Sequence, residues 1–405
     1  MPNVSLCEDA PTTVHYNPFH DYSQDYFTMI VTSGGNIKWS GSTTANTLSY
    51  SKDNGENWSA VTSADTISVA AGDKVLWKGT PAPQTNKGIG RFSGATGVRY
   101  SVEGNAMSLL FGYNFKAQTS LNGKEYAFYC LFSGNTNVVS AKNLSLPATT
   151  LADNCYRNMF KGCTSLTTAP KLPATTLANS CYSNMFQGCT SLTTAPELLP
   201  ATTLADNCYN SMFYGCKSLT TAPKLLPATK LEYSCYSNMF YGCKSLTTAP
   251  KLPATTLASE CYYQMFYGCT SLTTAPELPA ETLADDCYSG MFNGCTSLTT
   301  APELPATTLA NGCYSGMFNG CTSLTTAPEL PATTLANRCY ESMFYGCTSL
   351  NSITCLATDI SASNCTSNWV NGVAASGTFT KAASMSNWTE GTNGTPSGWT
   401  VKDAA

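Results

Sequence analysis

The chain has 405 residues, 42% of them apolar, which is enough for two or three structural units with packed cores. Charged residues make up only 11%, and 21 basic against 25 acidic side chains leave a net charge of −4, so the basic surface that binds nucleic acid is excluded. The chain contains no run of 18 apolar residues, so the sequence predicts no membrane span. With only two histidines, His15 and His20, we expect no histidine catalysis and no cofactor.

The N-terminal quarter predicts an all-β sandwich over residues 25–118, after an arm of residues 1–24. The arm has neither a basic start nor an apolar stretch, so it predicts no secretory signal. Short β-prone runs alternate with turns rich in Gly and Asn, which is typical of a sandwich. The expected strands are residues 27–31, 37–39, 47–50, 66–69 and 74–77.

Within this region, Ser51, Asp53, Gly55 and Trp58 form the pattern S-x-D-x-G-x-x-W. The pattern resembles the Asp-box hairpin of sialidase-type propellers. It occurs once, and no set of arginines and acidic residues accompanies it, so we interpret it as a structural turn clamped by Trp58. A carbohydrate-active enzyme is the alternative, and activity on glycans that Asp53→Ala abolishes would distinguish the two.

A repeat dominates residues 147–354, preceded by a degenerate copy over residues 119–146. Its first cysteine recurs every 26 or 27 residues, and a second cysteine follows eight positions later. Each 27-residue step carries a doubled leucine, Leu198-Leu199 or Leu225-Leu226. The first cysteines of the eight full copies are Cys155, Cys181, Cys208, Cys235, Cys261, Cys287, Cys313 and Cys339.

The repeated unit predicts one coil of a solenoid. Asp153 is placed to cap a short helix over residues 155–160, and Gly162 to end it. A short strand follows from Leu166 and stops at Pro170, because proline lacks the N–H that a strand ladder needs. At about 4.8 Å between strands, eight coils predict an arc on the order of 40 Å. We expect a curved rod with strands on one face and helices on the other.

The segment Met-Phe-x-Gly-Cys-Thr-Ser-Leu-Thr-Thr-Ala-Pro-Glu-Leu-Pro resembles the BspA-type (Treponema-type) leucine-rich repeat of bacterial surface proteins. That family's repeat has an aromatic residue, a Gly-Cys pair, a leucine three residues on and a short strand ending in proline. The chain departs from it in its 26-residue period and in Ala169, where a bulkier aliphatic residue is usual. The resemblance implies adhesion and protein or glycan binding without catalysis.

Residues 355–405 predict a C-terminal cap and tail. Cys365 lies 26 residues after Cys339, and Trp369-Val370 stands where the repeat has Met-Phe, as expected of a terminal copy that covers an open coil. The fold class is therefore mixed: an all-β sandwich, then an α/β leucine-rich-repeat solenoid with degenerate caps. The N-terminal sandwich and this tail together resemble proteins encoded by gut Bacteroidetes and their phages.

The cysteine columns predict buried thiols that fill space in the core. Zinc binding is the less favoured alternative, because the chain has no C-x-x-C pattern or partnering histidine, and disulfides between stacked coils are another. We therefore expect no metal site. A charged column after each Ala-Pro pair, including three consecutive glutamates at its end, is interpreted as a solvated stripe.

Variable positions between the conserved columns indicate where a ligand binds. Aromatic side chains are enriched in binding patches. The alternative is that these rings only pack over neighbouring coils. The candidate binding residues are Tyr214, Tyr241, Tyr263, Tyr267 and Tyr345, and no catalytic residue is expected.

These features predict a non-enzymatic binding or structural protein. The first hypothesis is a phage virion component, such as a fibre, decoration or host-recognition protein, whose N-terminal region contacts other virion proteins. The alternative is a secreted bacterial cell-surface adhesin whose signal has been removed. On either hypothesis the partner is a protein or a cell-surface glycan, with no nucleic acid and no membrane span.

Overall fold

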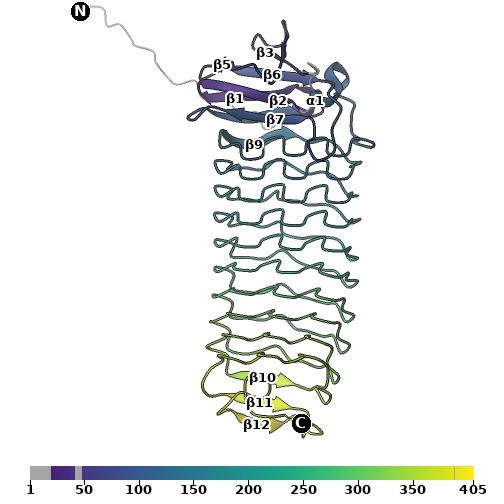
Figure 1. Ribbon diagram of the computed structural model, residues 1–405, viewed down its shortest axis with the longest axis vertical. Helices are drawn as coiled ribbons and strands as arrows, with labels where there is room; N and C mark the ends of the chain where they lie inside the picture. Colours follow the sequence, from purple (N-terminus) through teal and green to yellow (C-terminus); the bar gives the residue numbers. More distant parts are fainter. Residues whose placement is uncertain (1–19, 42–47, 387) are drawn as a thin grey trace, which may run out of the picture.

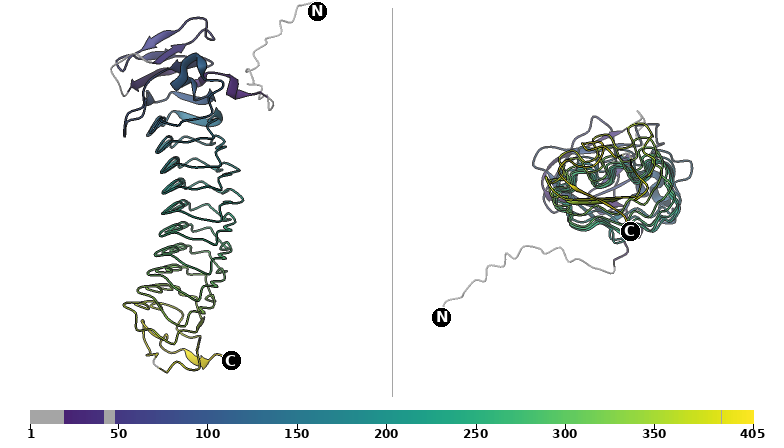
Figure 2. Two further views of the ribbon diagram at one scale, coloured as in Figure 1. Left: turned by 90° about the vertical axis from the view of Figure 1, so that its right-hand side faces the viewer. Right: turned by 90° about the horizontal axis from the view of Figure 1, so that it is seen from below.

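The computed structural model describes residues 20–41, 48–386 and 388–405. His15, Cys7, most of the predicted arm and residue 47 of one predicted strand lie outside them. The N-terminal region holds two sheets, followed by a stack of coils that ends in a small third sheet (Figure 1). Figure 2 shows that the stack is a gently curved rod.

The first sheet has six strands in the order β4-β3-β6-β1-β8-β9, and the second has three in the order β5-β2-β7. All five predicted strands are present. Four others, β4, β7, β8 and β9, were not predicted. Glycines at both ends of β7 and polar residues in β8 hide the alternation of apolar and polar side chains. The strands are β1 (Phe27–Ser33), β2 (Gly35–Gly41), β3 (Leu48–Ser51), β4 (Ser59–Val61), β5 (Ile67–Val69), β6 (Lys74–Gly79), β7 (Gly90–Gly94), β8 (Arg99–Asn105) and β9 (Val138–Ser145).

Aromatic side chains from the two sheets meet in one core. Phe92 of β7 lies 5.6 Å from Phe27 of β1, 4.8 Å from Trp77 of β6 and 4.7 Å from Trp39 of β2, between ring centroids. Three short helices border the sheets: η1 (Tyr22–Gln24), α1 (Ser108–Phe111) and η2 (Gly112–Asn114). The buried Ser108 hydroxyl accepts from the N–H of Phe27 and donates to the carbonyl of Trp77, which fixes α1 on the sheet.

Strand β9 joins the N-terminal sheets to the coils. It pairs in parallel with β8 on one side. On the other side, the Ala141 N–H donates to the Thr168 carbonyl at 3.0 Å, and the Thr167 N–H donates to Val139 at 2.9 Å. One hydrophobic core runs from Phe27 to Trp399. The sheets therefore cover the first coil directly, without a linker.

The predicted short helix is wrong: residues 152–163 form a series of tight turns. The residues with positive φ recur every four positions, at Asn154 (58°), Asn158 (59°) and Gly162 (72°). A right-handed helix cannot contain left-handed residues at this spacing. We call this segment of each coil the turn ribbon.

Backbone hydrogen bonds explain why the ribbon replaces a helix. Alternate N–H groups close turns within the coil, as Cys155 does to Ala152 at 3.2 Å. The others donate to the next coil, as Tyr156 does to Cys181 at 2.9 Å. A helix would use these groups internally and leave nothing to join the coils. The predicted cap is also wrong, because Asp153 accepts from the Asn179 N–H of the next coil at 3.0 Å.

The ribbon lines up aromatic side chains into two buried columns. Ring centroids in the Tyr column lie 5.6–6.2 Å apart, and those in the Phe column 5.2–5.8 Å apart, with planes within 21° of parallel. Offset stacking of this kind adds to the hydrophobic contribution of burial. The Tyr column contains Tyr156, Tyr182, Tyr209, Tyr236, Tyr262, Tyr288, Tyr314 and Tyr340, and the Phe column Phe132, Phe160, Phe186, Phe213, Phe240, Phe266, Phe292, Phe318 and Phe344.

The predicted strand of each coil is reduced to isolated parallel bridges, such as Thr168↔Thr194 and Thr194↔Thr221. Some threonine hydroxyls donate to the coil before, as Thr220 does to the Thr193 carbonyl at 3.1 Å. Regular strands return at the C-terminal end. There β10 (Ser352–Cys355), β11 (Thr378–Lys381) and β12 (Thr400–Asp403) form a parallel sheet.

Trp369 covers the end of both aromatic columns. Its ring lies 6.1 Å from Tyr340 and 6.2 Å from Phe344, with Trp388 stacked on its other side at 5.6 Å. The side chain is fully buried, and its indole N–H donates to the Gly394 carbonyl. The larger indole ring therefore covers the last rings of both columns, as the aromatic rings of the next coil do elsewhere in the stack.

Candidate binding surface

Two positions of each turn ribbon vary in sequence, and the second of them is partly or fully exposed in every full coil. In the coil that begins at Cys155 they are Arg157 and Lys161, which flank the buried Met159 and Phe160. The left-handed residues fix the ribbon's course, so the same two positions recur in every coil. The second position forms a continuous surface column on a rigid support, whereas the first column is interrupted by the buried Ser183 and Ser237.

Three of the five candidate tyrosines stack on one another in one of these columns. The rings of Tyr214 and Tyr241 lie 4.5 Å apart with an interplanar angle of 7°, and those of Tyr241 and Tyr267 lie 4.4 Å apart at 1°. All three side chains are half-buried. We call Tyr214, Tyr241 and Tyr267 the tyrosine ladder.

The ladder is an uncharged surface at neutral pH. Burial, and to a lesser extent the phenols of Tyr267 and Tyr214, raises the pKa of Tyr241 to about 12. Each inner ring face is covered by the next ring, so the ladder offers its ring edges and hydroxyl groups to solvent. Such a surface combines apolar contact with hydrogen bonding.

The other two candidates lie apart from the ladder. Tyr263 occupies the first column, where burial raises its pKa first and the nearby carboxylates of Asp286 and Glu260 raise it further. Tyr345 is 44% exposed and is separated from Tyr267 by two coils that carry Asn293 and Asn319 in the same column. The structure thus brings three of the five tyrosines into contact.

Sequence reasoning missed other exposed apolar side chains on the solenoid: Leu198 is 69% exposed, Tyr233 45% and Leu225 43%. The two leucines are the extra residues of the 27-residue steps. Their partners Leu199 and Leu226 fill the core, so the inserted residue is pushed outward. The doubled leucine was the signal that could have identified them.

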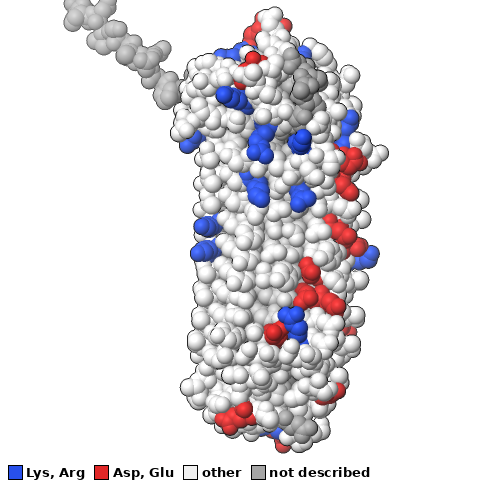
Figure 3. Space-filling view, in the orientation of Figure 1, with Lys and Arg blue, Asp and Glu red and all other residues white. Residues whose placement is uncertain are grey.

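Charged side chains are sparse on the face shown in Figure 3. The basic ones gather in the half of the rod nearer the N-terminal end, whereas the acidic ones are spread along the rod from its N-terminal tip to its C-terminal end. The coils that carry the tyrosine ladder also carry basic side chains, among them Lys217, Lys244 and Lys251.

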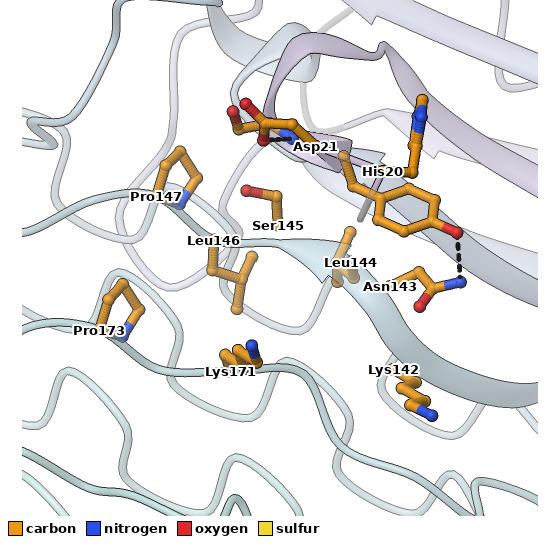
Figure 4. Close-up of a pocket in the computed structure, with 12 residues that line it drawn as sticks. His20, Asp21, Lys142, Asn143, Leu144, Ser145, Leu146, Pro147, Lys171 and Pro173 are labelled. Carbon is orange, nitrogen blue, oxygen red and sulfur yellow. Dashed lines mark hydrogen bonds between the residues drawn. The ribbon is translucent and has the colours of Figure 1, made fainter. Parts of the chain in front are cut away.

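A pocket of about 360 Å³ lies where η1, the end of β9 and the next coil meet (Figure 4). The polar groups on its wall engage one another: Asn143 donates to the Tyr22 hydroxyl at 3.0 Å, and Asp21 accepts from the Ser23 N–H at 3.0 Å. His20 lies 2.5 Å from the carboxylate of Asp25, which raises the histidine pKa. The hydrogen bond to Asp25 therefore engages this histidine.

The Asp-box is a structural turn, as predicted. The Asp53 carboxylate accepts from the Ser51 hydroxyl at 2.6 Å and from the Asn57 N–H at 2.9 Å, and these bonds lower its pKa to about 2. The Trp58 indole N–H donates to the Gly55 carbonyl at 3.0 Å. A carboxylate held in this way closes its own hairpin and is unsuited to accept a proton in catalysis.

The cysteines are buried, as predicted; this holds for all 19 that the structure describes. Thiols of the second column donate to a phenylalanine carbonyl of the coil before, as Cys163 does to Phe132 at 3.0 Å. Burial raises the pKa of Cys155 to about 12, so the thiolate needed for nucleophilic attack or metal binding is disfavoured.

The described residues contain no group of three or more His, Cys, Asp or Glu side chains arranged to hold a metal ion. Over the same part of the chain, no helix has the length and hydrophobicity needed to cross a bilayer.

Fold and surface together define a leucine-rich-repeat solenoid with a rigid outer face. The family model "BspA type Leucine rich repeat region (6 copies)" matches residues 124–247, 207–328 and 282–368. Because these matches cover more than half of the chain, the protein belongs to the BspA-type leucine-rich-repeat family. The resemblance identified from the repeat is confirmed.

Two solved structures are similar at a distance. A leucine-rich repeat protein from Bacteroides ovatus ATCC 8483 is 17% identical over 76% of this chain and 95% of its own, with a TM-score of 0.22. A leucine rich cell surface protein from Faecalibacterium prausnitzii A2-165 is 18% identical over 78% and 90%, with a TM-score of 0.25. These values are too low to indicate a function. No curated protein matches the chain.

Proposed function

We propose that this protein is a non-enzymatic adhesin of the bacterial cell surface, whose solenoid binds a protein or a glycan through the tyrosine ladder. The observation that carries the proposal is the ladder itself, in which Tyr214, Tyr241 and Tyr267 stack at 4.4–4.5 Å on a rigid ribbon. Pre-arranged aromatic side chains lose little conformational entropy on binding. Membership of the BspA-type family supports a binding role.

The geometry of the ladder favours a protein ligand over a glycan. Sugars stack on open aromatic faces, but here each inner face is covered by the next tyrosine. The exposed ring edges and hydroxyl groups suit a surface that offers both apolar side chains and hydrogen-bonding groups, as protein interfaces do. Tyr263 and Tyr345 are proposed as peripheral contacts.

The virion hypothesis is retained only as the second candidate. The comparisons give no support for a phage component, and the family favours the alternative, a secreted or surface-attached adhesin. We propose the cell surface as its location. In both cases the sheets of residues 25–118 would form a β-sandwich that anchors the chain, and the solenoid of residues 147–354, between caps at 119–146 and 355–405, would face outward.

The test is binding of the wild type to arrays of extracellular proteins and of glycans, followed by the triple variant Tyr214→Ala, Tyr241→Ala, Tyr267→Ala. We expect one or more protein ligands, and at least tenfold weaker binding by the variant. The single variant Tyr233→Ala, which truncates an exposed ring of the solenoid outside the proposed site, is the matched control and should bind as the wild type does. Unchanged binding by the triple variant would contradict the proposed site, and hydrolysis of any glycan would contradict a non-enzymatic role.

A further inference from the structure

One exposed column of the solenoid reverses its charge halfway along the rod. The position after each Ala-Pro pair is Lys224 and Lys251 in two consecutive coils and Glu277 and Glu303 in the next two. All four side chains are exposed, and none takes part in an ion pair within the described residues. These charges are therefore available to a partner.

The reversal extends along the rod but not to residues 1–103, which contain 7 basic and 9 acidic side chains. Residues 104–251 contain 11 basic and 5 acidic side chains, whereas residues 252–405 contain 3 basic and 11 acidic ones. A rod with this distribution has one basic and one acidic half. Complementary potentials between surfaces steer association and fix the register of a complex, and the two halves of this rod are complementary to each other.

An apolar groove lies at the point of reversal. It has a volume of about 340 Å³, with Leu225 and Pro253 in its wall and Lys251 and Glu277 beside them. Leu225 is 43% exposed because it is the inserted residue of its coil. The prolines that recur along this corner have no N–H to hydrate. The corner therefore combines an apolar centre with charges of opposite sign on its two sides.

We propose that this corner is the contact between two copies of this chain, packed antiparallel about a twofold axis that passes between Lys251 and Glu277. In a twofold contact the same patch is used on both molecules, so it must complement itself. The axis places Lys251 opposite the partner's Glu277 and Lys224 opposite the partner's Glu303, each pair occurring twice. Parallel packing would instead place like charges opposite each other.

The size of the contact fits a weak dimer. Eight coils span roughly 40 Å, and a strip about 15 Å wide along them covers about 600 Å² on each copy, at the lower end of specific interfaces. One pair opposes the arrangement, since Glu197 lies opposite the partner's Glu329. The dimer should therefore depend strongly on salt and should tighten when Glu197 is changed.

The first experiment measures the oligomeric state of the full chain by analytical ultracentrifugation at 50 and 500 mM NaCl. We expect a dimer at low salt that dissociates at high salt. The variants Lys224→Glu/Lys251→Glu and Glu277→Lys/Glu303→Lys should each be monomeric, because the four central positions of the column then carry one sign. Mixed in equal amounts they should dimerise again, because these four positions become complementary between the two variants. A monomeric wild type at 100 µM and low salt, or variants that dimerise alone, would overturn the proposal.

The second experiment tests the orientation with a zero-length carbodiimide cross-linker on a mixture of light and isotopically heavy chains. Lys224 and Glu303 are three coils apart, about 14 Å within one chain, so a direct amide between them forms only between copies. We expect this light–heavy cross-link, and severalfold tighter dimers for Glu197→Lys. Light–heavy cross-links that join Lys224 to Glu197 and none to Glu303 would indicate another packing and overturn the antiparallel arrangement.

Discussion

The left-handed residues of the turn ribbon decide which backbone groups face the next coil. Glycine adopts this conformation without steric cost, whereas a residue with a Cβ pays about 1–2 kcal/mol. The chain nevertheless places Ser342 (φ 52°) at a position where the two preceding coils have Gly290 and Gly316. The ribbon therefore tolerates local strain because its hydrogen bonds to the neighbouring coils fix it.

Adding a side chain at Gly316 and removing the side chain of Ser342 should change the stability of the protein in opposite directions. Gly316→Ala should lower the free energy of unfolding by about 1–2 kcal/mol through backbone strain alone, because the nearest atom to the new Cβ is 3.9 Å away. Ser342→Gly should raise it by up to about 1 kcal/mol, since the relief of strain exceeds the entropy lost by glycine. Urea unfolding measures both.

The control is Ser289→Gly, at a ribbon position with negative φ. It should destabilise the protein by about 0.5–1 kcal/mol, because there glycine brings only its entropic cost. A stabilising Ser289→Gly would show that the gain at residue 342 has another cause.

At the scale of the element, each coil was predictable in its period but not in its backbone. The cysteine, leucine and proline columns gave the repeat, the buried side chains and the terminal copies. The ribbon was mistaken for a helix because apolar residues at i and i+4 suit both. Asn158, Asn184 and Gly290 in one column were the local signal for left-handed residues. The hydrogen bonds to the next coil join residues about 26 apart, beyond the reach of any local pattern.

The candidate site was predictable to the same extent. Tyr214, Tyr241 and Tyr267 share one column, so their neighbourhood followed from the period alone. Their stacking depends on the spacing of the coils, which the sequence does not specify. The exposure of Leu198 and Leu225 was not predicted. A residue inserted into a buried column is either packed into the core or displaced to the surface, and the outcome depends on the packing around it.

The buried cysteine columns predict a steep loss of stability at alkaline pH. Burial raises the pKa of Cys208, Cys216 and Cys287 to about 12 in the folded protein, against about 8.5 in the unfolded chain. Because the folded pKa is raised, the stability linked to these thiols is complete below pH 8.5 and is lost as the pH rises toward 12. Within that window, each such thiol lowers the free energy of unfolding by about 1.4 kcal/mol for every unit by which the pH rises.

Thermal unfolding under reductant between pH 7.5 and 10 measures this effect. We expect a constant Tm up to about pH 8.5 and a steep fall above it. The variant Cys216→Ala/Cys243→Ala/Cys269→Ala removes three thiols that are buried and hydrogen-bonded to carbonyls. Its stability should fall less steeply with pH, whatever its value at neutral pH. An identical slope would assign the alkaline transition to other groups.

At the scale of the whole molecule, the coils touch mainly their neighbours, so stability is a sum of coil and interface contributions. The two ends differ in how they are covered. The N-terminal end continues through β9 into a six-stranded sheet, whereas the C-terminal end relies on Trp369, which lies over Tyr340 and Phe344. Unfolding should therefore begin at the C-terminal end.

Trp369→Ala should confine its damage to the last coils. Removing a buried Trp side chain costs about 3–5 kcal/mol, but only the coils near Cys339 and β10 lose a covering surface. Hydrogen exchange should therefore accelerate at Ile353 and Phe344, while the amide of Tyr156 near the N-terminal end stays protected. Tyr345→Ala, which truncates an exposed ring in the same coil, should leave both regions unchanged. Equal acceleration along the whole rod would mean that the solenoid unfolds as one cooperative unit.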